Sequence, residues 1–199
     1  MKRTKQQAEE TRTEILRTAE RLFLEVGYDS VTMEQIAQAA GVTRGAISWH
    51  FDNKAGLLTS LRSELQEPFD ILAATLGARE ERYPLVLLAE TVKQLFIKLE
   101  AEPRQRGLKL ISLRLDAALN TVPVNEPNIV DRLRVVFEAA QKVTPLRNPW
   151  TPHSAALSMG ALLRGTIGEW ALSKTEFSLV SHGHEMVCDL LRQWSGSKI

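Results

Sequence analysis

Residues 32–51 read TMEQIAQAAGVTRGAISWHF and have the spacing of two short helices joined by a tight turn. Thr32 and Gln35 stand three residues apart, which is the pattern of a capping box at the start of a helix. Gly41 favours the end of that helix, and Thr43 can cap a second helix that fills the rest of the segment. The segment therefore predicts a helix-turn-helix.

Burial of the apolar residues of this segment would leave its second helix with a single exposed face. The residues expected to pack together inside are Ile36, Ala37, Val42, Ile47 and Phe51. The exposed face then carries Thr43, Arg44, Gly45, Ser48 and Trp49. Because this face has an arginine on its first turn and small residues beside it, it suits insertion into the major groove of DNA.

Several residues of the helix-turn-helix have a specific expected contact with DNA. Arg44 is long enough to reach base edges, where arginine paired with guanine is the commonest specific contact. The small Gly45 allows the helix to approach closely. The helix N-termini capped by Thr32 and Thr43 suit phosphate oxygens, because they combine free N–H groups with the positive end of the helix dipole. Lys54, near the start of the next helix, can pair with a phosphate as a point charge.

The residues on both sides of the segment also have helical periodicity. Thr11 and Glu14 have the spacing of a further capping box, which predicts a first helix that begins at Thr11 and ends at Gly27. Residues 52–53, Asp-Asn, predict a break after the helix-turn-helix. A longer fourth helix should follow, and Pro68 should kink or divide it.

The rest of the chain is predicted to be helical as well. Apolar stripes at helical spacing recur between residues 88 and 137. Residues 144–153, TPLRNPWTPH, hold three prolines and predict a loop before two long helices, over residues 154–174 and 179–194. No alternating strand pattern is visible. We therefore expect an all-α protein of about nine helices in two parts.

The composition excludes several classes of protein. The 199 residues are 44% apolar and 25% charged, which is typical of a globular chain with a substantial core and not of a disordered one. No apolar run approaches the roughly 20 residues of a membrane span, and the start MKRTKQQAEETR has no apolar signal region. The single cysteine, Cys188, excludes an internal disulfide framework and suits a reducing cytosol. We therefore expect a cytoplasmic protein with no membrane partner.

The net charge of +1 gives no argument for nucleic-acid binding by itself, but the basic residues are unevenly distributed. Lys2, Arg3 and Lys5 form a basic N-terminal arm that contains no acid. Such an arm is either a solvated terminus or an additional contact to DNA phosphates. Lys2 and Arg3 are the residues of the arm that we assign to DNA.

Residues 11–58 resemble the DNA-binding domain of the TetR family of bacterial repressors. The resemblance rests on the lead-in ILRTAERLFLEVGYDSVT, on IAQAAGV, on G-x-x-x-x-H-F and on N-K-x-x-L-L. Within the family, VTRGAIxWHFxNKAxLL is most similar to the AcrR-like branch, whose members repress multidrug efflux pump genes. PRQRGLKLI near Pro103 and LLRGTIGEWALSKTEFSL near Leu162 extend the resemblance over most of the chain.

The resemblance implies a basic arm over residues 1–8, a DNA-binding domain over residues 9–69, and a ligand-binding and dimerisation domain over residues 70–199. It further implies a homodimer that binds double-stranded operator DNA, with a four-helix interface made by the last two helices of each chain. The residues expected at this interface are Ala161, Gly165, Gly168, Val187, Leu190, Leu191 and Trp194. Core contacts within a single chain are the alternative for the same residues.

The resemblance also implies a small-molecule effector, aromatic and amphipathic, that binds among the middle helices. The residues expected to line its site are Phe96, Leu113, Met159, Leu163 and Trp170, with Arg114, Asp116 or Glu169 as polar anchors. Apolar residues at this spacing are also typical of an ordinary helical core. Effector binding would favour a separation of the two recognition helices that no longer fits the operator.

Other functions are compatible with parts of the sequence. A regulator of a metabolic operon would carry the same helix-turn-helix, and an interaction module could present its second helix to a protein. A helical enzyme could use Glu169 or His153, although no nucleophile–base pair is indicated. His182, His184 and Cys188 could suggest a metal site, but positions i and i+2 do not share a helix face. Because no Gly-rich phosphate loop is present, no cofactor is expected.

Ser48 is the clearest departure from the family pattern within the second helix. Members of the family usually have tyrosine at this position, and that tyrosine tends to contact backbone phosphate. Serine keeps a hydroxyl group but loses the ring and its reach. Either Ser48 contacts a nearer phosphate or base, or Trp49 and His50 carry more of the anchoring.

Restoring the tyrosine should change which operators the protein prefers, while DNA binding is retained. We expect Ser48→Tyr to shift the base preference, because the added ring reaches the DNA backbone and alters how the helix sits in the groove. Anisotropy titrations of wild type and variant against a common set of duplexes measure this preference. Identical affinities and identical sequence preferences would contradict the role given to Ser48.

Overall fold

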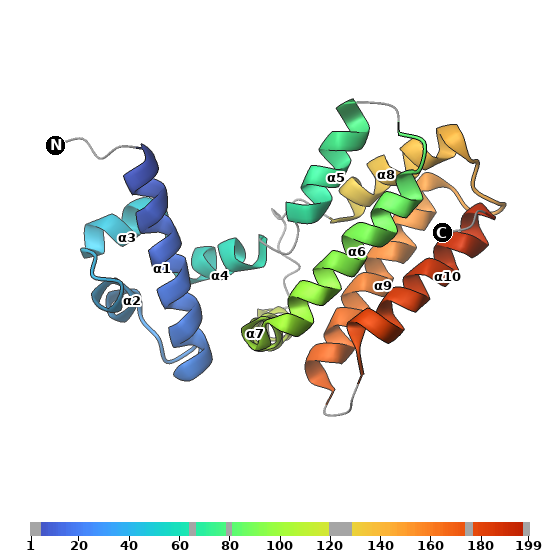
Figure 1. Cartoon of the computed structure of the whole chain (residues 1–199). Helices are drawn as coiled ribbons and strands as arrows, with labels where there is room; N and C mark the ends of the chain where they lie inside the picture. The colour runs from blue at the N-terminus through green and yellow to red at the C-terminus, as the bar shows by residue number, and fades with distance from the viewer. Residues whose placement is uncertain (1–4, 64–66, 79–80, 120–128, 174–176, 197–199) are drawn as a thin grey trace. The chain divides into compact units, whose positions relative to one another are not determined.

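The computed structural model describes residues 5–63, 67–78, 81–119, 129–173 and 177–196. Every regular element within these ranges is helical, and none of them contains a β-strand (Figure 1). The predicted all-α class is therefore confirmed. Contacts divide the chain into two compact units, residues 1–64 and residues 65–199. The predicted domain boundaries after residues 8 and 69 stay predictions.

The first unit consists of four helices around one small core. They are α1 (Lys5–Glu25), α2 (Met33–Ala39), α3 (Arg44–His50) and α4 (Lys54–Ser63). Helix α1 packs against α2 and α4, and α2 packs against α3 (Figure 1). The buried apolar residues of the first unit are Ile15, Leu16, Ala19, Phe23, Val31, Ile36, Ala37, Ile47, Phe51, Leu57, Leu58 and Leu61. Of the residues expected inside the helix-turn-helix, only Val42 is half-buried instead of buried.

The predicted caps of the helix-turn-helix are present. Gln35 N donates to Thr32 Oγ1 over 3.2 Å, and Thr32 N donates to Gln35 Oε1 over 2.8 Å, which completes the capping box. Ala46 N donates to Thr43 Oγ1 over 3.1 Å at the start of α3. Gly41 has a φ of +66°, a backbone conformation that glycine adopts without steric cost.

One predicted helix start is wrong. Helix α1 begins at Lys5, so Thr11 lies inside the helix, and its hydroxyl donates to the carbonyl of Gln7 over 2.7 Å. The charged residues before Thr11 looked like a solvated arm, but lysine, glutamine, alanine and glutamate are good helix formers and extend the helix by more than a turn. The capping pattern at Thr11 and Glu14 is therefore coincidental.

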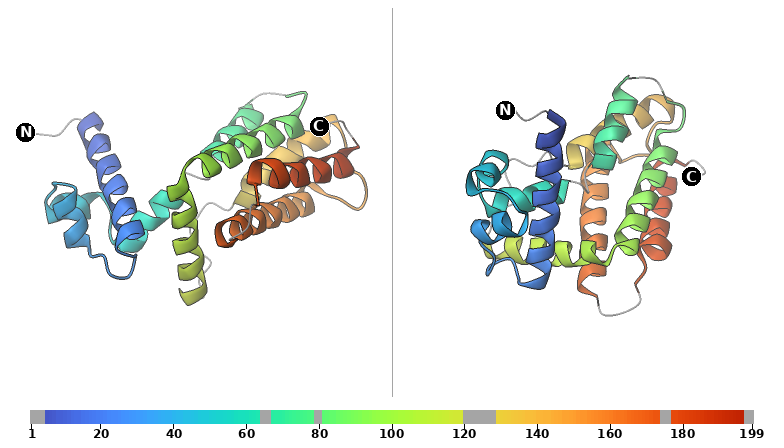
Figure 2. Two further views of the ribbon diagram at one scale, coloured as in Figure 1. Left: turned by 60° about the horizontal axis from the view of Figure 1, so that its bottom comes forward. Right: turned by 60° about the vertical axis from the view of Figure 1, so that its left-hand side comes forward.

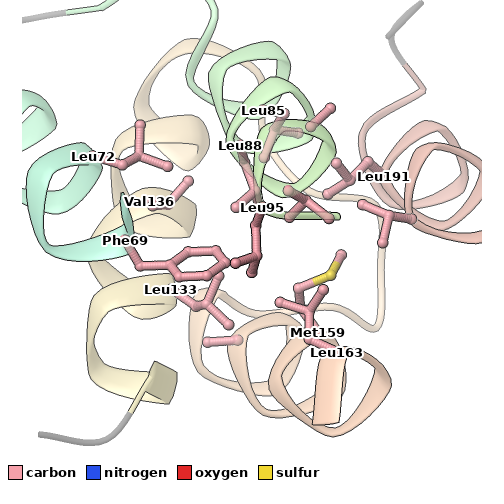
Figure 3. Packing of buried hydrophobic residues seen from close by; sticks show 14 of the residues in the cluster. Phe69, Leu72, Leu85, Leu88, Leu95, Leu133, Val136, Met159, Leu163 and Leu191 are labelled. Carbon is pink, nitrogen blue, oxygen red and sulfur yellow. The ribbon is translucent and has the colours of Figure 1, made fainter. Parts of the chain in front are cut away.

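The second unit contains the remaining helices. They are α5 (Glu67–Ala78), α6 (Pro84–Ala101), α7 (Pro103–Leu119), α8 (Ile129–Val143), α9 (Pro152–Leu172), the π-helical turn η1 (Leu179–Gly183) and α10 (His184–Ser195). Helix α8 packs against α5, α6 and α9, and α6 also packs against α10 (Figure 2). Figure 3 shows the core of this unit, to which α5, α6, α8, α9 and α10 all contribute.

Proline positions agree with separate helices. Pro68 is the second residue of α5, where a missing N–H costs nothing because the first turn of a helix leaves its N–H groups unpaired. Pro152 occupies the corresponding first turn of α9, beside a capping box between Thr151 and Ser154. The division of the predicted long fourth helix is thus confirmed, and the described residues hold ten α-helices instead of about nine.

The last helix begins with a wider turn than the sequence predicts. Leu179 N, in η1, donates to the Glu100 carboxylate of α6 over 2.5 Å. A Cβ atom on Gly183 would lie 3.0 Å from Phe96 Cε2 and 3.0 Å from Thr166 Cγ2. Because a Cβ atom at this position would be in unusually tight contact with both neighbours, glycine allows this end of the last helix to lie close to α6 and α9. None of the described helices is long and apolar enough to cross a membrane.

Candidate nucleic-acid interface

Helix α3 has one buried face and one exposed face. Ile47 is fully buried, and Phe51 is buried directly after the helix ends. Most residues of this segment that were predicted to face DNA are exposed: Thr43, Arg44, Gly45, Ser48 and Trp49. His50 is half-buried. The structure therefore brings the predicted recognition residues together on one face of one helix.

Trp49 is the largest apolar side chain on this face and is 73% exposed. Its ring meets the ring of His50 edge-on, with centroids 4.5 Å apart. The two rings extend the exposed surface of α3 toward its C-terminal end. An exposed aromatic ring beside polar residues suits contact with sugars or thymine methyl groups, which are the apolar parts of a DNA groove.

Arg44 is joined to α2 by an ion pair that the sequence analysis did not predict. Arg44 Nη1 lies 3.2 Å from Glu34 Oε1, and the two side chains are 78% and 57% exposed. Glu34 belongs to the first turn of α2, where the helix dipole favours a negative charge. The spacing of the two residues in the sequence gave no signal for this contact, because it depends on the angle between the helices.

Lys54 makes contacts within its own chain, and its contact with a phosphate stays a prediction. Its ammonium group donates to the backbone carbonyls of Tyr28 over 2.6 Å, of Asp29 over 3.3 Å and of Val31 over 2.9 Å. The same nitrogen lies 4.5 Å from the centroid of the Tyr28 ring. These three carbonyls can take all three N–H donors of the ammonium group. Lys54 thus connects α4 to the loop between α1 and α2 by hydrogen bonds.

Arg12 and Tyr28 are further structural residues of this unit that sequence reasoning missed. The Arg12 guanidinium lies 5.2 Å from the centroid of the Phe51 ring and donates to Ser60 Oγ over 3.3 Å. Burial raises the pKa of the Tyr28 phenol, and the neighbouring Asp29 carboxylate raises it further. Helical periodicity gives no signal for these contacts, because Arg12 contacts residues far along the chain and Tyr28 lies in the α1–α2 loop.

The predicted DNA contacts at Lys2 and Arg3 lie outside the described residues. Lys5, the third basic residue of the predicted arm, is exposed and begins α1. The assignment of Lys2 and Arg3 to DNA stays a prediction.

The residues predicted to bind an effector differ in how deeply they are buried in the second unit. Phe96, Met159, Leu163 and Trp170 all belong to its buried core, and Figure 3 shows Met159 and Leu163 pointing into it. Leu113 is half-buried on α7, and the side chains of Arg114 and Asp116 lie outside the described part of the chain. Glu169 is exposed, so it does not join the buried group.

Arg106 is a neighbour of this group that the sequence analysis did not single out. Its guanidinium lies 5.6 Å from the centroid of the Trp170 ring. Its N–H groups donate to the carbonyl of Ala171 over 3.2 Å and to the carbonyl of Ser173. Arg106 of α7 therefore satisfies carbonyl groups at the C-terminal end of α9, an end that favours a positive charge.

The residues predicted at the dimer interface also fall into two groups. Ala161 and Gly165 of α9 are exposed, as are Leu157 and Leu172 of the same helix. The predicted interface residues of the last helix lie against their own chain: Val187, Leu191 and Trp194 are buried, and Leu190 is half-buried. Gly168 of α9 is buried as well, although a Cβ atom added there would meet no heavy atom of the described residues within 4 Å. The apolar stripe of the last helix thus makes core contacts within one chain, the alternative noted from the sequence.

The residues considered for catalysis or metal binding do not come together in one group, although Cys188 Sγ lies 3.5 Å from His184 Nε2. His153 and Glu169 are both exposed at opposite ends of α9, about 24 Å apart at a rise of 1.5 Å per residue. His182 Nδ1 accepts from Ser178 N over 3.3 Å, whereas His184 Nε2 lies 3.2 Å from the carbonyl oxygen of Ala89. Over the described ranges, no three histidine, cysteine or acidic residues are grouped to hold a metal. Burial raises the pKa of the Cys188 thiol.

Removal of the Lys54 ammonium group should destabilise the first unit. We expect Lys54→Met to lower the free energy of unfolding by about 1–3 kcal/mol, because three charge-assisted hydrogen bonds are lost. Lys54→Arg should be intermediate, since a planar guanidinium cannot direct its donors at the same three converging carbonyls. Thermal unfolding measures the loss. Unchanged stability, together with a salt dependence of DNA binding reduced by about one phosphate contact, would assign Lys54 to DNA instead.

Comparisons with known proteins agree with this geometry. Residues 15–61 match the tetR family of bacterial regulatory proteins. The probable HTH-type transcriptional regulator ArpR of Pseudomonas putida is 31% identical over 206 residues, with 96% of each chain covered. The structure of NalD, the secondary repressor of the MexAB-OprM multidrug efflux pump in Pseudomonas aeruginosa, superimposes with a TM-score of 0.66 at 28% identity, covering 96% of this chain and 98% of that one.

A complex of SmeT with triclosan is also similar, with a TM-score of 0.74 at 28% identity over 92% of this chain and 90% of that one. SmeT is the repressor of the Stenotrophomonas maltophilia multidrug efflux pump SmeDEF. The match to ArpR extends through both units, so the similarity is not confined to the helix-turn-helix. The chain is a member of the tetR family of bacterial transcriptional regulators.

Proposed function

We propose that this regulator represses a multidrug efflux operon by binding its operator as a homodimer, and that a small aromatic effector releases it. The observation that carries the proposal is the exposed face of α3, on which Arg44, Gly45, Ser48 and Trp49 lie together above a buried Ile47. The efflux target is supported by NalD and SmeT, which are both repressors of multidrug efflux pumps. A regulator of a metabolic operon is the alternative, and it would use the same face.

Arg44 is the residue that we assign to base reading. It is the first residue of α3, and in helix-turn-helix proteins the N-terminal residues of the recognition helix contact base edges. Gly45, the next residue, adds no side chain that would keep the helix away from the groove. Ser48 and Trp49 lie one turn further along the helix, where contacts to the sugar–phosphate backbone fix its orientation.

A homodimer would place two such helices on DNA. The exposed residues Leu157, Ala161, Gly165 and Leu172 of α9 leave an apolar and small-residue surface for a second copy. Two-fold symmetry then sets the half-sites one helical turn of DNA apart, about 34 Å, or a multiple of that distance. The operator of such a dimer is expected to be a palindrome.

The effector would bind in the second unit. Phe96, Met159, Leu163 and Trp170 supply apolar and aromatic surface, and Arg106 supplies a positive charge next to Trp170. SmeT, which shares the fold, forms a complex with triclosan. We expect the effector to bind more tightly to the form of the protein that does not fit the operator. At saturation, it then lowers the affinity for DNA by the ratio of its binding constants for that form and for the form that fits the operator.

Arg44→Ala should weaken specific DNA binding. We expect a loss of affinity of about fivefold or more for duplexes that the wild type has enriched from a random-sequence library, because one bidentate arginine–guanine contact is worth about 1–3 kcal/mol. Arg21→Ala, which removes an exposed arginine of α1, is the matched control and should bind as the wild type does. Anisotropy titrations at several salt concentrations give both affinity and salt dependence. Unchanged affinity of Arg44→Ala for the enriched duplexes would remove Arg44 from base reading.

Triclosan should release the wild type from the same enriched duplexes. The expected result is a rise in the apparent dissociation constant of the DNA complex that saturates with effector concentration, as linkage requires. Calorimetric titration of the free protein checks that the compound binds in the absence of DNA. Release by sugars or amino acids, with no effect of apolar aromatic compounds, would favour a metabolic operon.

A further inference from the structure

The ion pair between Glu34 and Arg44 connects the two helices of the helix-turn-helix on the exposed surface of the first unit. Its nitrogen and oxygen atoms are 3.2 Å apart, and both side chains are more than half exposed. An ion pair this exposed contributes little to folding, because water screens the charges and two long side chains lose rotamer freedom. Stability alone therefore does not account for its position beside the residue assigned to base reading.

Both partners are attached to well-fixed backbone. Glu34 lies in the first turn of α2, between Thr32 and Gln35 of the capping box, and Arg44 begins α3 directly after its cap, Thr43. Helix α2 also packs against α3. The carboxylate thus acts on Arg44 from a defined direction, and it restricts a side chain that would otherwise be free to sample many rotamers at the start of α3.

The chemistry of guanidinium lets Glu34 affect phosphate and base contacts differently. A guanidinium has five N–H donors, and the contact with Glu34 is made through one terminal nitrogen, so donors remain for the O6 and N7 atoms of guanine. The negative carboxylate offsets the charge that draws Arg44 toward phosphate. The attraction of an arginine to phosphate does not depend on the DNA sequence, whereas its contacts with base edges do.

We propose that Glu34 is a positioning residue that makes Arg44 a better reader of bases and a poorer ligand for phosphate. This inference rests on the proposed function, in which Arg44 contacts a base. Glu34 then lowers the affinity for DNA of arbitrary sequence more than the affinity for the operator. Its effect is a larger ratio between operator binding and non-specific binding, which is the quantity that decides occupancy in a genome.

The test uses Glu34→Gln, which removes the charge and keeps the side-chain length. Its probes are a duplex enriched from a random-sequence library by the wild type and a scrambled duplex of the same composition. We expect the variant to bind the scrambled duplex about 3–10-fold more tightly and the enriched duplex with a smaller gain, so that the ratio of the two affinities falls. The logarithmic salt slope for the scrambled duplex should steepen by about 0.9 for each phosphate contact that Arg44 gains.

Glu25→Gln is the matched control. Glu25 pairs with Arg21 over 3.1 Å on α1, and the two glutamate side chains are equally exposed, 58% for Glu25 and 57% for Glu34. This variant removes the same charge from the same unit and frees another arginine, so its ratio of affinities should equal that of the wild type. Thermal unfolding should show that both variants fold as the wild type does.

Repeating Glu34→Gln in the Arg44→Ala background separates a direct effect from one that acts through the arginine. If Glu34 acts through Arg44, the substitution leaves the ratio of affinities unchanged in that background. An equal gain for both duplexes in the single variant, or the same fall in ratio with and without Arg44, would overturn the positioning role while leaving the proposed function intact. Wild-type affinity of Arg44→Ala for the enriched duplex would overturn the positioning role together with the assignment of Arg44 to base reading.

Discussion

The burial of Ile47 is the constraint on which the DNA-binding surface depends. A seven-residue helix in water is marginal by propensity alone, so α3 keeps its conformation because Ile47 and the adjacent Phe51 are buried in the core of the first unit. Because the face of α3 that carries Ile47 is buried, the opposite face of the helix must be exposed. Arg44, Ser48 and Trp49 are exposed together as a direct consequence of one apolar contact.

Long polar side chains add contacts between helices and loops to those made by the apolar cores. In the first unit, the ammonium group of Lys54 contacts three carbonyls of the α1–α2 loop, and the guanidinium of Arg12 lies over the Phe51 ring. In the second unit, the Glu100 carboxylate accepts from the start of the last helix, and Arg106 donates to the end of α9. Lys54, Glu100 and Arg106 each satisfy backbone groups at the end of a helix or in a loop, where helical hydrogen bonding stops.

The sequence predicted most of the elements that depend on local patterns, although the local pattern at Thr11 and Glu14 gave a wrong helix start. The caps at Thr32 and Thr43 depend on residues within one turn of each other, and the outward face of α3 follows from helical periodicity. Contacts between helices have no such local signal, which is why the ion pair of Arg44 with Glu34 was not anticipated. The same reason accounts for Trp194, whose apolar stripe suggested a partner chain but which packs on Phe137 and Trp150 of its own chain.

The distribution of tryptophan gives each unit its own optical signal. Of the four tryptophans in the chain, only Trp49 lies in the first unit, and it is 73% exposed, whereas Trp170 and Trp194 are buried in the second unit and Trp150 is half-buried there. A water-soluble quencher such as iodide reaches the exposed indole of Trp49 far more readily than the buried ones. The intrinsic emission of the unlabelled protein can therefore distinguish an event at α3 from one in the helical core of the second unit.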